Sequence, residues 1–456
     1  MSLPGLEAVR ALAPVPDAWL VGGSVRDLML GRAVVDVDLV VADDPAAAAR
    51  GLARSSGGAP FPLSDRHGAW RVVRDGHTVD ISRSHGPVAD DLGRRDFTIN
   101  AMAVPLAGGE VLDPHGGRAD LEAGRLRAVS EQVFADDPLR LLRLARLAHE
   151  LGFTVDPEAE RLARRDAHLA DRPSGERVLT EIRRLLEPDH PEEGIRLLDR
   201  LGVLDVVLPE AVAMRGVGQS QFHHLDVFEH TLKVLDAAAD VSAHVDHYLR
   251  DASAPVQAAL DAEVGNDFNG HTGLRLAALF HDIEKPATRT VSDEGRVEFM
   301  GHDRLGADTA RRVLERWRAS HALIRFCRVL VAEHLRLGFL VRERPFDRRT
   351  AYRYLQATEP YAYESIVLSL ADRLATRGVR ARQAYVRAHS QAAVELIHLL
   401  RELESEEREP LLRGDEIAEI AGATGPRIGE LVAVLAEEQA AGTVTTREEA
   451  IALVRG

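Results

Sequence analysis

Two carboxylates two residues apart, Asp36 and Asp38, are the residues whose type and spacing most directly predict chemistry in this sequence. They lie in an apolar run from Val34 to Val41 that is typical of a β-strand, and a strand directs residues i and i+2 to the same face. Two carboxylates side by side repel each other unless a cation lies between them. The pair predicts a Mg²⁺ site, although two solvated aspartates on an edge strand would give the same short pattern.

A glycine pair, Gly22-Gly23, lies upstream, between an apolar segment (19–21) and a segment of helical pattern (25–30). Glycines let the backbone approach a phosphate closely, and the N-terminus of the following helix offers free N–H groups and the positive end of its dipole. A phosphate-binding turn followed by two carboxylates on one face outlines a nucleotidyl-transfer site.

Five further polar residues are candidates for the same site. Asp80 lies in a second strand-like segment and would add a third carboxylate near the metal; an ordinary exposed strand aspartate explains it equally well. Arg94 and Arg95 offer fixed forks of donors to phosphate oxygens. Asp96 and Asn100, four residues apart on an expected helical turn, have the right groups to bond sugar hydroxyls. Without the upstream motif, this segment would read as a charged helix start.

The composition narrows the class of protein. At 456 residues, two to four domains are expected. The net charge of −15 argues against a nonspecific polyanion binder but leaves room for a nucleic-acid enzyme with local basic surfaces. Cys327 is the only cysteine, which excludes an internal disulfide and a thiolate zinc site. Without an apolar run of eighteen residues or a signal-peptide pattern, we expect a cytoplasmic protein that contacts no membrane.

The chain changes character near residue 120. Before that point short apolar strands alternate with helices and loops, with strand candidates at 70–73, 77–82 and 101–105; afterwards the periodicity is helical. Proline and glycine breaks and an acidic stretch suggest the later boundaries. The sequence predicts an α+β fold with an α/β head over 1–120, an all-α neck over 121–213, a helical domain over 214–400 and a helical tail over 401–456.

Four motifs carry a family resemblance over residues 18 to 190. They are Val21-Gly22-Gly23-Ser24-Val25-Arg26-Asp27 with Asp36-Val37-Asp38, the run Arg94-Arg95-Asp96-Phe97-Thr98-Ile99-Asn100, Asp113-Pro114-His115-Gly116-Gly117, and Asp136-Asp137-Pro138-Leu139-Arg140. In order and spacing, this set resembles the bacterial class II tRNA nucleotidyltransferase and poly(A) polymerase family. The resemblance implies a polymerase-β-like nucleotidyltransferase head, and it departs from the family at Asp136, where Glu is common.

The resemblance also implies the reaction and the residues that carry it. The 3′-hydroxyl of a tRNA acceptor stem would attack the α-phosphate of CTP or ATP, with pyrophosphate leaving and two Mg²⁺ ions held by Asp36 and Asp38, with Asp80 nearby. Asp137 and Arg140 would read the incoming base, since a carboxylate accepts from N4 of cytosine and a guanidinium donates to N3 and O2. The implied nucleotide-binding set is Gly22, Gly23, Ser24, Arg26, Arg94, Arg95, Asp96, Asn100, Asp137, Arg140, Arg143 and Arg146.

One departure bears on how many nucleotides are added. Family members that complete the whole CCA end carry a long loop after the position of Asp80, whereas here only residues 81–90 separate Asp80 from Asp91. The short loop is similar to that of CC-adding members, which act with a separate A-adding enzyme, and it favours CC addition. Complete CCA addition and poly(A) synthesis remain alternatives.

A second group of metal-ligating residues follows in the helical part. In order along the chain it comprises His230, His281, Asp282, His302, His334 and Asp372. Imidazole and carboxylate without thiolate suit Mn, Fe, Ni, Co or Mg. The order resembles the HD phosphohydrolase superfamily, in which Lys285 would match a catalytic-site lysine; Glu284 departs from the usual glycine before it. Buried, satisfied histidines are the alternative.

The HD resemblance implies a second activity, since a bound divalent transition metal or Mg²⁺ would activate water for attack on phosphorus. Two further readings stay open. The hydrolase could be the main activity, with the head serving as an RNA-binding module. The tail, with Gly425-Pro426-Arg427, could contact RNA phosphate at a helix start, or form a plain turn.

Overall fold

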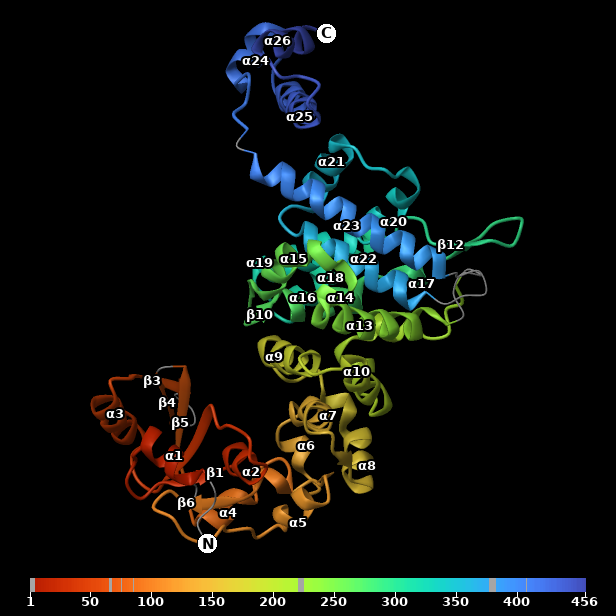
Figure 1. Cartoon of the computed structure of the whole chain (residues 1–456). Helices are drawn as coiled ribbons and strands as arrows, with labels where there is room; N and C mark the ends of the chain where they lie inside the picture. The colour runs from red at the N-terminus through yellow and green to blue at the C-terminus, as the bar shows by residue number, and fades with distance from the viewer. Residues whose placement is uncertain are drawn as a thin grey trace. The chain divides into compact units, whose positions relative to one another are not determined.

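The computed structural model describes residues 5–64, 68–74, 76–84, 86–219, 225–376, 383–406 and 408–456 (Figure 1). These residues form two compact units, the first from Met1–Pro173 with Arg196–Val207 and the second from Ser174–Ile195 with Leu208–Gly456. Among the described residues, no helix has both the length and the apolar character needed to cross a membrane. The predicted boundaries at 120, 213 and 400 stay predictions.

A six-stranded sheet organises the first unit. Its strands follow the order β3-β4-β5-β2-β1-β6. The pair β2–β5 is parallel, and the other neighbours are antiparallel. Because β2 lies inside the sheet, its apolar residues Val37 and Leu39 are buried at 1% exposure and fix the alternation of the strand. The strands are β1 (Trp19–Val21), β2 (Asp36–Val41), β3 (Ala59–Ser64), β4 (Ala69–Arg74), β5 (His77–Arg83) and β6 (Ala103–Pro105).

The first unit also contains short helices. Asp44 caps α3, whose N1 residue is Pro45, and α3 packs against β3, β4 and β5. Helix α7 begins after residue 120, where the sequence periodicity is helical. The elements are α1 (Leu6–Leu12), α2 (Gly23–Met29), α3 (Pro45–Ser56), α4 (Val88–Leu92), η1 (Thr98–Asn100), α5 (Gly117–Glu122), α6 (Val133–Asp136), α7 (Arg140–Leu151), α8 (Pro157–Asp166), η2 (Ala167–Leu169) and α11 (Leu204–Val207).

The α+β fold class is confirmed, and three details differ from the sequence prediction. The strand expected at 101–105 is confined to β6. Strand β3 was not predicted, since Pro60 and Pro62 cannot donate to a ladder; β3 tolerates them because it lies at the edge of the sheet. The neck is not all helical, because β7 (Arg125–Leu126) pairs with β8 (Thr154–Val155).

The second unit is helical. Helix α13 packs against α16 and α22, and α18 packs against α19. Leu232, Leu276 and Leu370 are fully buried in this bundle. Its first helices are α9 (Gly175–Leu186), α10 (Pro191–Arg200, which continues into the first unit), α12 (Pro209–Val212), α13 (Val227–Ala243), α14 (Val245–Leu249), η3 (Arg250–Ala252), α15 (Ser253–Asp261), α16 (Gly270–Phe280), α17 (Lys285–Thr288), α18 (His302–Arg316) and α19 (His321–Glu333).

The remaining elements of this unit are α20 (Arg336–Leu340), η4 (Val341–Glu343), α21 (Arg348–Thr358), α22 (Ala362–Ala375), α23 (Gln383–Ser405), α24 (Gly414–Ala421), α25 (Pro426–Ala441) and α26 (Arg447–Arg455), with the short strands β9 (Glu263–Gly265), β10 (Phe268–Asn269), β11 (Thr290–Val291) and β12 (Val297–Glu298). Helices α24 to α26 enclose a small core around Ile417 and Leu435. Helix α25 packs on α21, where Arg353 pairs with Glu437 at 2.7 Å.

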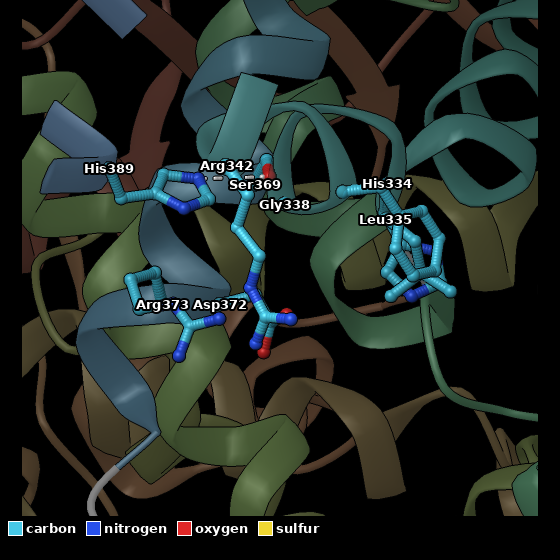
Figure 2. A pocket seen from close by; sticks show the side chains of 9 residues that line it. His334, Leu335, Gly338, Arg342, Ser369, Asp372, Arg373 and His389 are labelled. Atoms are coloured by element: carbon cyan, nitrogen blue, oxygen red, sulfur yellow. Dashed lines mark hydrogen bonds between the residues drawn. The ribbon is translucent and has the colours of Figure 1, made fainter. Parts of the chain in front are cut away.

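A cavity of about 340 Å³ opens in the second unit (Figure 2). Residues from the C-terminus of α19, from α20, η4, α22 and α23 line it. Asp372 of α22 and His334, which follows α19, both belong to the predicted metal set and both line the cavity. The cavity therefore adjoins the second candidate site.

Candidate active sites

The backbone of α2 and β2 fixes the carboxylates of the first site. Asp36 and Asp38 share a face of β2, opposite the buried Val37. The Ser24 hydroxyl donates to the Asp36 carbonyl at 3.0 Å and accepts from the Asp38 N–H at 2.9 Å. Ser24 is buried at 2% exposure, so its hydroxyl joins the start of α2 to the strand that carries the aspartates.

Strand register brings the third carboxylate to the same place. In the parallel pairing of β2 with β5, Asp38 lies beside Asp80. Asp80 accepts from Arg71 Nε and Nη2, each at 2.7 Å, from the neighbouring β4. A bidentate arginine holds a carboxylate in one orientation. Sequence reasoning missed Arg71; its register opposite Asp80 in the β4–β5 hairpin was the available signal.

Asp38 shows the electrostatic cost of this arrangement. Burial raises the pKa of Asp38 to about 6, the negative charges of Asp80 and Asp36 add to the rise, and the charges of Arg95 and Arg143 oppose it. A carboxyl group with such a pKa is partly protonated in weak acid and holds its negative charge at a free-energy cost. A divalent cation would remove that cost, so these oxygen donors fit Mg²⁺.

Gly22 forms the approach to these carboxylates. Its φ is +70°, a conformation that favours glycine, and a Cβ there would lie 2.4 Å from Arg95 Nη1 and 3.5 Å from Asp38 Oδ2. The guanidinium of Arg95 therefore lies against the glycine turn, beside the candidate metal ligand. The buried Arg95 Nε has no hydrogen-bond partner among the described residues. This geometry suits a phosphate between the glycine turn, the arginine and the aspartates.

The substitution Gly22→Ala tests whether a phosphate lies against the Gly22 turn. The added methyl group would displace the Arg95 guanidinium and strain a left-handed backbone, so we expect a KM for the nucleotide substrate raised about tenfold and a loss of about 1 kcal/mol in unfolding free energy. Steady-state kinetics and urea unfolding measure the two effects. Gly31→Ala is the matched control, because Gly31 has φ +68° and no atom within 4 Å of the Cβ position. An unchanged KM in Gly22→Ala would contradict the phosphate approach.

Asp96 and Asn100 form a buried network. Asp96 accepts from Asn100 Nδ2 at 2.9 Å and from Arg143 Nη2 at 2.7 Å, and Arg26 Nη1 donates to Asn100 Oδ1 at 2.8 Å. Burial would raise the pKa of Asp96, but the Arg143 charge and the bonds from Asn100 and the Phe97 N–H hold it well below its usual range. These side chains bond one another from segments up to 74 residues apart, and their contact with a nucleotide stays a prediction.

The predicted base-reading residues lie where α6 ends and α7 begins. Arg140 is the first residue of α7, and its guanidinium donates to the Val133 carbonyl at 3.1 Å and the Arg94 carbonyl at 2.6 Å. Asp137 accepts from the Leu139 N–H at 3.3 Å. Backbone groups therefore hold the start of α7 against the segment that carries Arg94. Farther along α7, Arg146 pairs with Glu150 at 2.5 Å.

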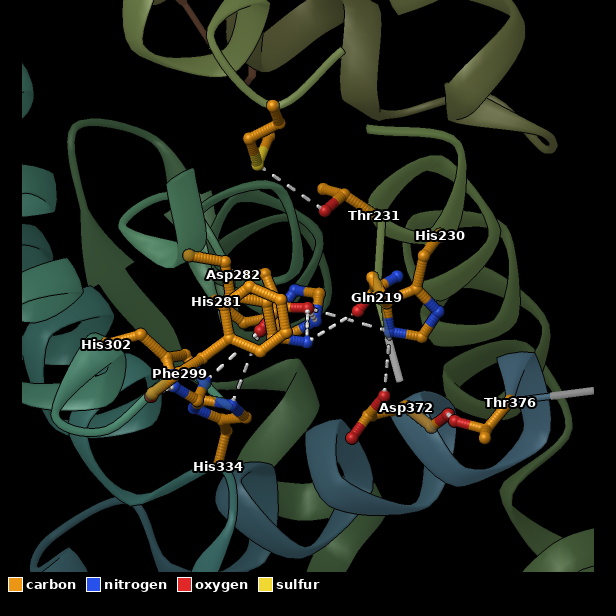
Figure 3. A network of polar contacts seen from close by, with 12 residues as sticks. Gln219, His230, Thr231, His281, Asp282, Phe299, His302, His334, Asp372 and Thr376 are labelled. Atoms are coloured by element: carbon orange, nitrogen blue, oxygen red, sulfur yellow. Dashed lines mark hydrogen bonds and ion pairs between the residues drawn. The ribbon is translucent and has the colours of Figure 1, made fainter. Parts of the chain in front are cut away.

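The second site lies in the helical unit, where the six predicted residues converge (Figure 3). Asp282 lies at their centre: its oxygens are 3.1 Å from His281 Nε2, 3.3 Å from His302 Nε2, 3.8 Å from His334 Nε2 and 3.7 Å from His230 Nε2. Asp372 lies 3.0 Å from His230 Nε2. The four histidines and Asp282 are almost completely buried.

Helix ends set the orientation of three imidazole rings. Nδ1 of His281, His302 and His334 lies 2.7, 2.6 and 2.7 Å from the carbonyl oxygen three residues earlier. A carbonyl only accepts, so each Nδ1 carries a hydrogen and a neutral ring keeps its Nε2 lone pair. At the C-termini of α16 and α19 such carbonyls lack an intrahelical partner, which favours this contact.

Three potential metal-ligating atoms of this cluster make no hydrogen bond within the described part of the chain. His281 Nε2, His302 Nε2 and Asp282 Oδ1 are buried and have no hydrogen-bond partner among the described residues. Nitrogen lone pairs facing a carboxylate in the protein interior are unfavourable unless a cation lies among them. His230, His281 and Asp282 offer atoms within 4.8 Å of one another, as do Asp282, His302 and His334. The residues fit a divalent metal held through Nε2 and carboxylate oxygens.

The charges of the cluster support the same conclusion. Burial would raise the pKa of Asp282, but the charges of His281 and Lys285 hold it well below its usual range. Burial and the charge of His281 lower the pKa of His334 to about 4, so its ring is neutral and available as a ligand near pH 7. Burial would lower the pKa of His281, yet Asp282 raises it, so a bound metal would compete with a proton there.

Lys285 lies inside this cluster. Its Nζ donates to Asp282 Oδ2 at 2.6 Å and to Gln219 Oε1 at 2.9 Å, and lies 5.4 Å from the Phe299 ring centroid. One of only two lysines in the chain is thus fixed beside the metal-ligand candidates. The sequence also offers His223 and His224 as possible extra contacts of this site, and both lie outside the described residues.

Known proteins with similar sequences span both sites. The chain is 37% identical over 96% of its length to an A-adding tRNA nucleotidyltransferase of Deinococcus radiodurans, covering 95% of that protein. It is 36% identical over 96% of its length to a CC-adding tRNA nucleotidyltransferase of Thermus thermophilus, covering 93%. The chain belongs to the tRNA nucleotidyltransferase family. A multifunctional CCA protein of Halorhodospira halophila is 33% identical over 76% of the chain and covers 82% of that protein.

Family models match the same regions. The poly A polymerase head domain matches residues 18–86 and 73–127, the probable RNA and SrmB-binding site of polymerase A matches residues 152–214, and the HD domain matches residues 227–377. The enzyme class and the presence of an HD domain are thereby confirmed. The first candidate site begins inside the head match, and all six ligand candidates of the second lie inside the HD match.

Solved structures confirm the fold. A Thermotoga maritima CCA-adding enzyme complexed with tRNA aligns with a TM-score of 0.60 at 20% identity, over 98% of this chain and 94% of that chain. A CCA-adding enzyme with CTP aligns with a TM-score of 0.61 at 21% identity, over the same shares. Members of the tRNA nucleotidyltransferase family thus share the order of a sheet-containing head and a long helical region.

Proposed function

We propose that this chain matures tRNA 3′ ends by transferring CMP from CTP to the terminal hydroxyl, and that it stops after adding CC. The shared face of Asp36, Asp38 and Asp80 beside the Gly22 turn carries the proposal of nucleotide transfer. The short connection after Asp80 supports the restriction to CC, because only residues 84–87 separate β5 from α4.

The proposed chemistry forms one phosphorus–oxygen bond and breaks one. The RNA 3′-oxygen attacks the α-phosphorus of CTP, and the bond to the bridging oxygen breaks, so pyrophosphate leaves. Asp36 and Asp38 would hold Mg²⁺, which when bound lowers the pKa of the attacking hydroxyl and neutralises the triphosphate. Arg95 and the N-terminus of α2 bind phosphate oxygens, and Arg71 keeps the Asp80 carboxylate turned toward this face.

Base selection would come from the start of α7. In the proposal, the Asp137 carboxylate accepts from N4 of cytosine and the Arg140 guanidinium donates to N3 and O2. The bonds from Arg140 to the carbonyls of Val133 and Arg94 support this role, since they hold the guanidinium beside the segment that would bind the triphosphate. A fixed guanidinium discriminates between bases better than a free one.

The products from tRNA that lacks its 3′ end test the proposed specificity. With CTP and ATP together, we expect products two nucleotides longer that end in CC, and no addition of A to a tRNA ending in CC. A CCA end would overturn the CC restriction and support complete addition. A-tails on arbitrary RNA would support poly(A) synthesis. The D. radiodurans relative is an A-adding enzyme, so the products should also be scored for addition of A alone. In that outcome, only tRNA ending in CC is extended.

We propose a phosphohydrolase as the second activity, with His230, His281, Asp282, His302, His334 and Asp372 as metal ligands. Three orphaned buried donor atoms carry this proposal. A bound divalent ion would supply positive charge to the phosphoryl group and lower the pKa of water. Lys285 holds the Asp282 carboxylate, and helix carbonyls fix the Nε2 atoms toward the centre. A head serving only to bind RNA is disfavoured, because its three carboxylates would then be costly without a role.

A further inference from the structure

The cavity beside the HD cluster offers room for a substrate (Figure 2). Its volume of about 340 Å³ is in the range of sites for small molecules, roughly 300–1,000 Å³. Two metal-ligand candidates, His334 and Asp372, form part of its wall. A molecule bound in this cavity would therefore touch the residues that hold the metal.

Two arginines give the cavity its charge. Arg342 follows α20, Arg373 lies on α22 next to Asp372, and both line the cavity. Figure 2 shows both side chains directed toward the region of Asp372. Neither guanidinium has a hydrogen bond or ion pair within the part of the chain that the structure describes, whereas nearby Arg344 pairs with Glu395 at 2.7 Å. In a chain of net charge −15, two arginines that line one cavity and have no partner among the described residues favour binding of an anion there.

Apart from the Asp372 carboxylate, the rest of the wall is neutral and partly aromatic. His389 is buried at 2% exposure and lies 3.2 Å from the Ser369 hydroxyl. Burial and the nearby charge of Arg373 lower the pKa of His389 to about 4, so the positive charge comes from the two guanidiniums alone. Phe339 lines the cavity and is 71% exposed. An exposed aromatic face beside an anion site suits a nucleobase.

We propose that Arg342 and Arg373 bind a second phosphate of the phosphohydrolase substrate, while the phosphate to be cleaved lies at the metal cluster. The inference rests on the proposed phosphohydrolase function and names its substrate class: nucleotides with phosphates on both the 3′ and 5′ sides of one ribose, as at a 3′-phosphorylated RNA end. A water oxygen bonds to the 3′-phosphorus, the ester bond to the ribose oxygen breaks, and the ribose oxygen takes up a proton. Phe339 stacks on the base.

Phosphate release from adenosine 3′-monophosphate and adenosine 3′,5′-bisphosphate tests this inference in the full-length chain with added Mn²⁺ or Ni²⁺. We expect wild type to prefer the bisphosphate by about tenfold or more in kcat/KM, and Arg342→Gln and Arg373→Gln each to lose about tenfold on the bisphosphate and little on the monophosphate. Arg328→Gln, on the exposed part of α19, is the control. Equal losses on both substrates, or no preference in wild type, would overturn the proposal.

Binding without metal separates this inference from the hydrolase itself. In EDTA, calorimetric titration with adenosine 3′,5′-bisphosphate should give a Kd about tenfold or more weaker in Arg373→Gln than in wild type or Arg328→Gln. Arginine-dependent binding without hydrolysis by any added metal would refute the hydrolase and retain the phosphate subsite. Hydrolysis without arginine dependence in rate or binding would refute the subsite and retain the hydrolase. Matching thermal unfolding curves would exclude misfolding of the variants.

Discussion

Asp38→Ala is expected to lower nucleotide transfer to tRNA at least about a thousandfold, because it removes one of the two carboxylates that would hold Mg²⁺ at the head. Asp38 is held in an unfavourable state, with a pKa raised to about 6 by burial and by its acidic neighbours. A buried carboxylate that has no cation beside it destabilises the folded chain. The presence of Asp38 here therefore indicates a role that requires its negative charge. Single-turnover transfer of CMP from CTP measures the loss.

Two controls make the Asp38 experiment specific. Asp43→Ala removes an exposed carboxylate shortly after β2 and should leave transfer unchanged. Phosphate release at the HD site should be unaffected by Asp38→Ala, because all six HD ligand candidates lie in the other compact unit. Because Asp38→Ala also relieves the repulsion from Asp80, the variant should be at least as resistant to urea as wild type. Transfer above a tenth of the wild-type rate would refute the assigned role of Asp38.

Local signals in the sequence were sufficient to predict the strand that carries Asp36 and Asp38 and the glycine turn before it. Alternation places Asp36 and Asp38 on one face of the strand. The glycine at position 22 predicts a turn that favours glycine, and in the structure Gly22 has a φ of +70°. The six HD candidates could be found by their order along the chain, which resembled a superfamily. In both cases a short segment or an ordered set of residue types carries the information.

Contacts between distant segments were beyond this kind of reasoning. The bidentate bond of Arg71 to Asp80 depends on hairpin register, and the bond of Arg26 to Asn100 joins segments 74 residues apart. Periodicity identifies a helix but not the partner of an arginine on it. The chain is rich in arginine, so only the structure separates the paired Arg344 from Arg342 and Arg373. Strand β3 was not predicted for a different reason. Its prolines argue against a strand, and only the strand order shows that β3 lies at a sheet edge, where prolines are tolerated.

His281→Ala is expected to reduce phosphate release at the HD site at least about a hundredfold while nucleotide transfer continues at the wild-type rate. His281 Nε2 is buried, has no hydrogen-bond partner among the described residues and lies 3.1 Å from Asp282, so it is a ligand candidate with no structural substitute. His321→Ala, at the exposed start of α19, is the matched control. Loss of both activities in His281→Ala would refute the two-site model.

Metal-dependent stability provides a second measurement that does not depend on knowing the substrate. A metal that binds only the folded chain adds about 2.7 kcal/mol to its stability at a hundredfold excess over Kd, and so raises Tm. Wild type and His321→Ala should show the full rise with Mn²⁺ or Ni²⁺, whereas His281→Ala and Asp282→Asn should show only the part that comes from metal bound at Asp36 and Asp38. Asp282→Asn keeps the side-chain shape and removes the charge that faces Lys285 and the imidazoles, so it separates loss of metal from loss of packing. A full metal-induced rise in Tm in both variants would refute the metal site. Metal binding would then depend neither on His281 nor on the central Asp282 carboxylate, and the cluster would be a structural set of buried histidines.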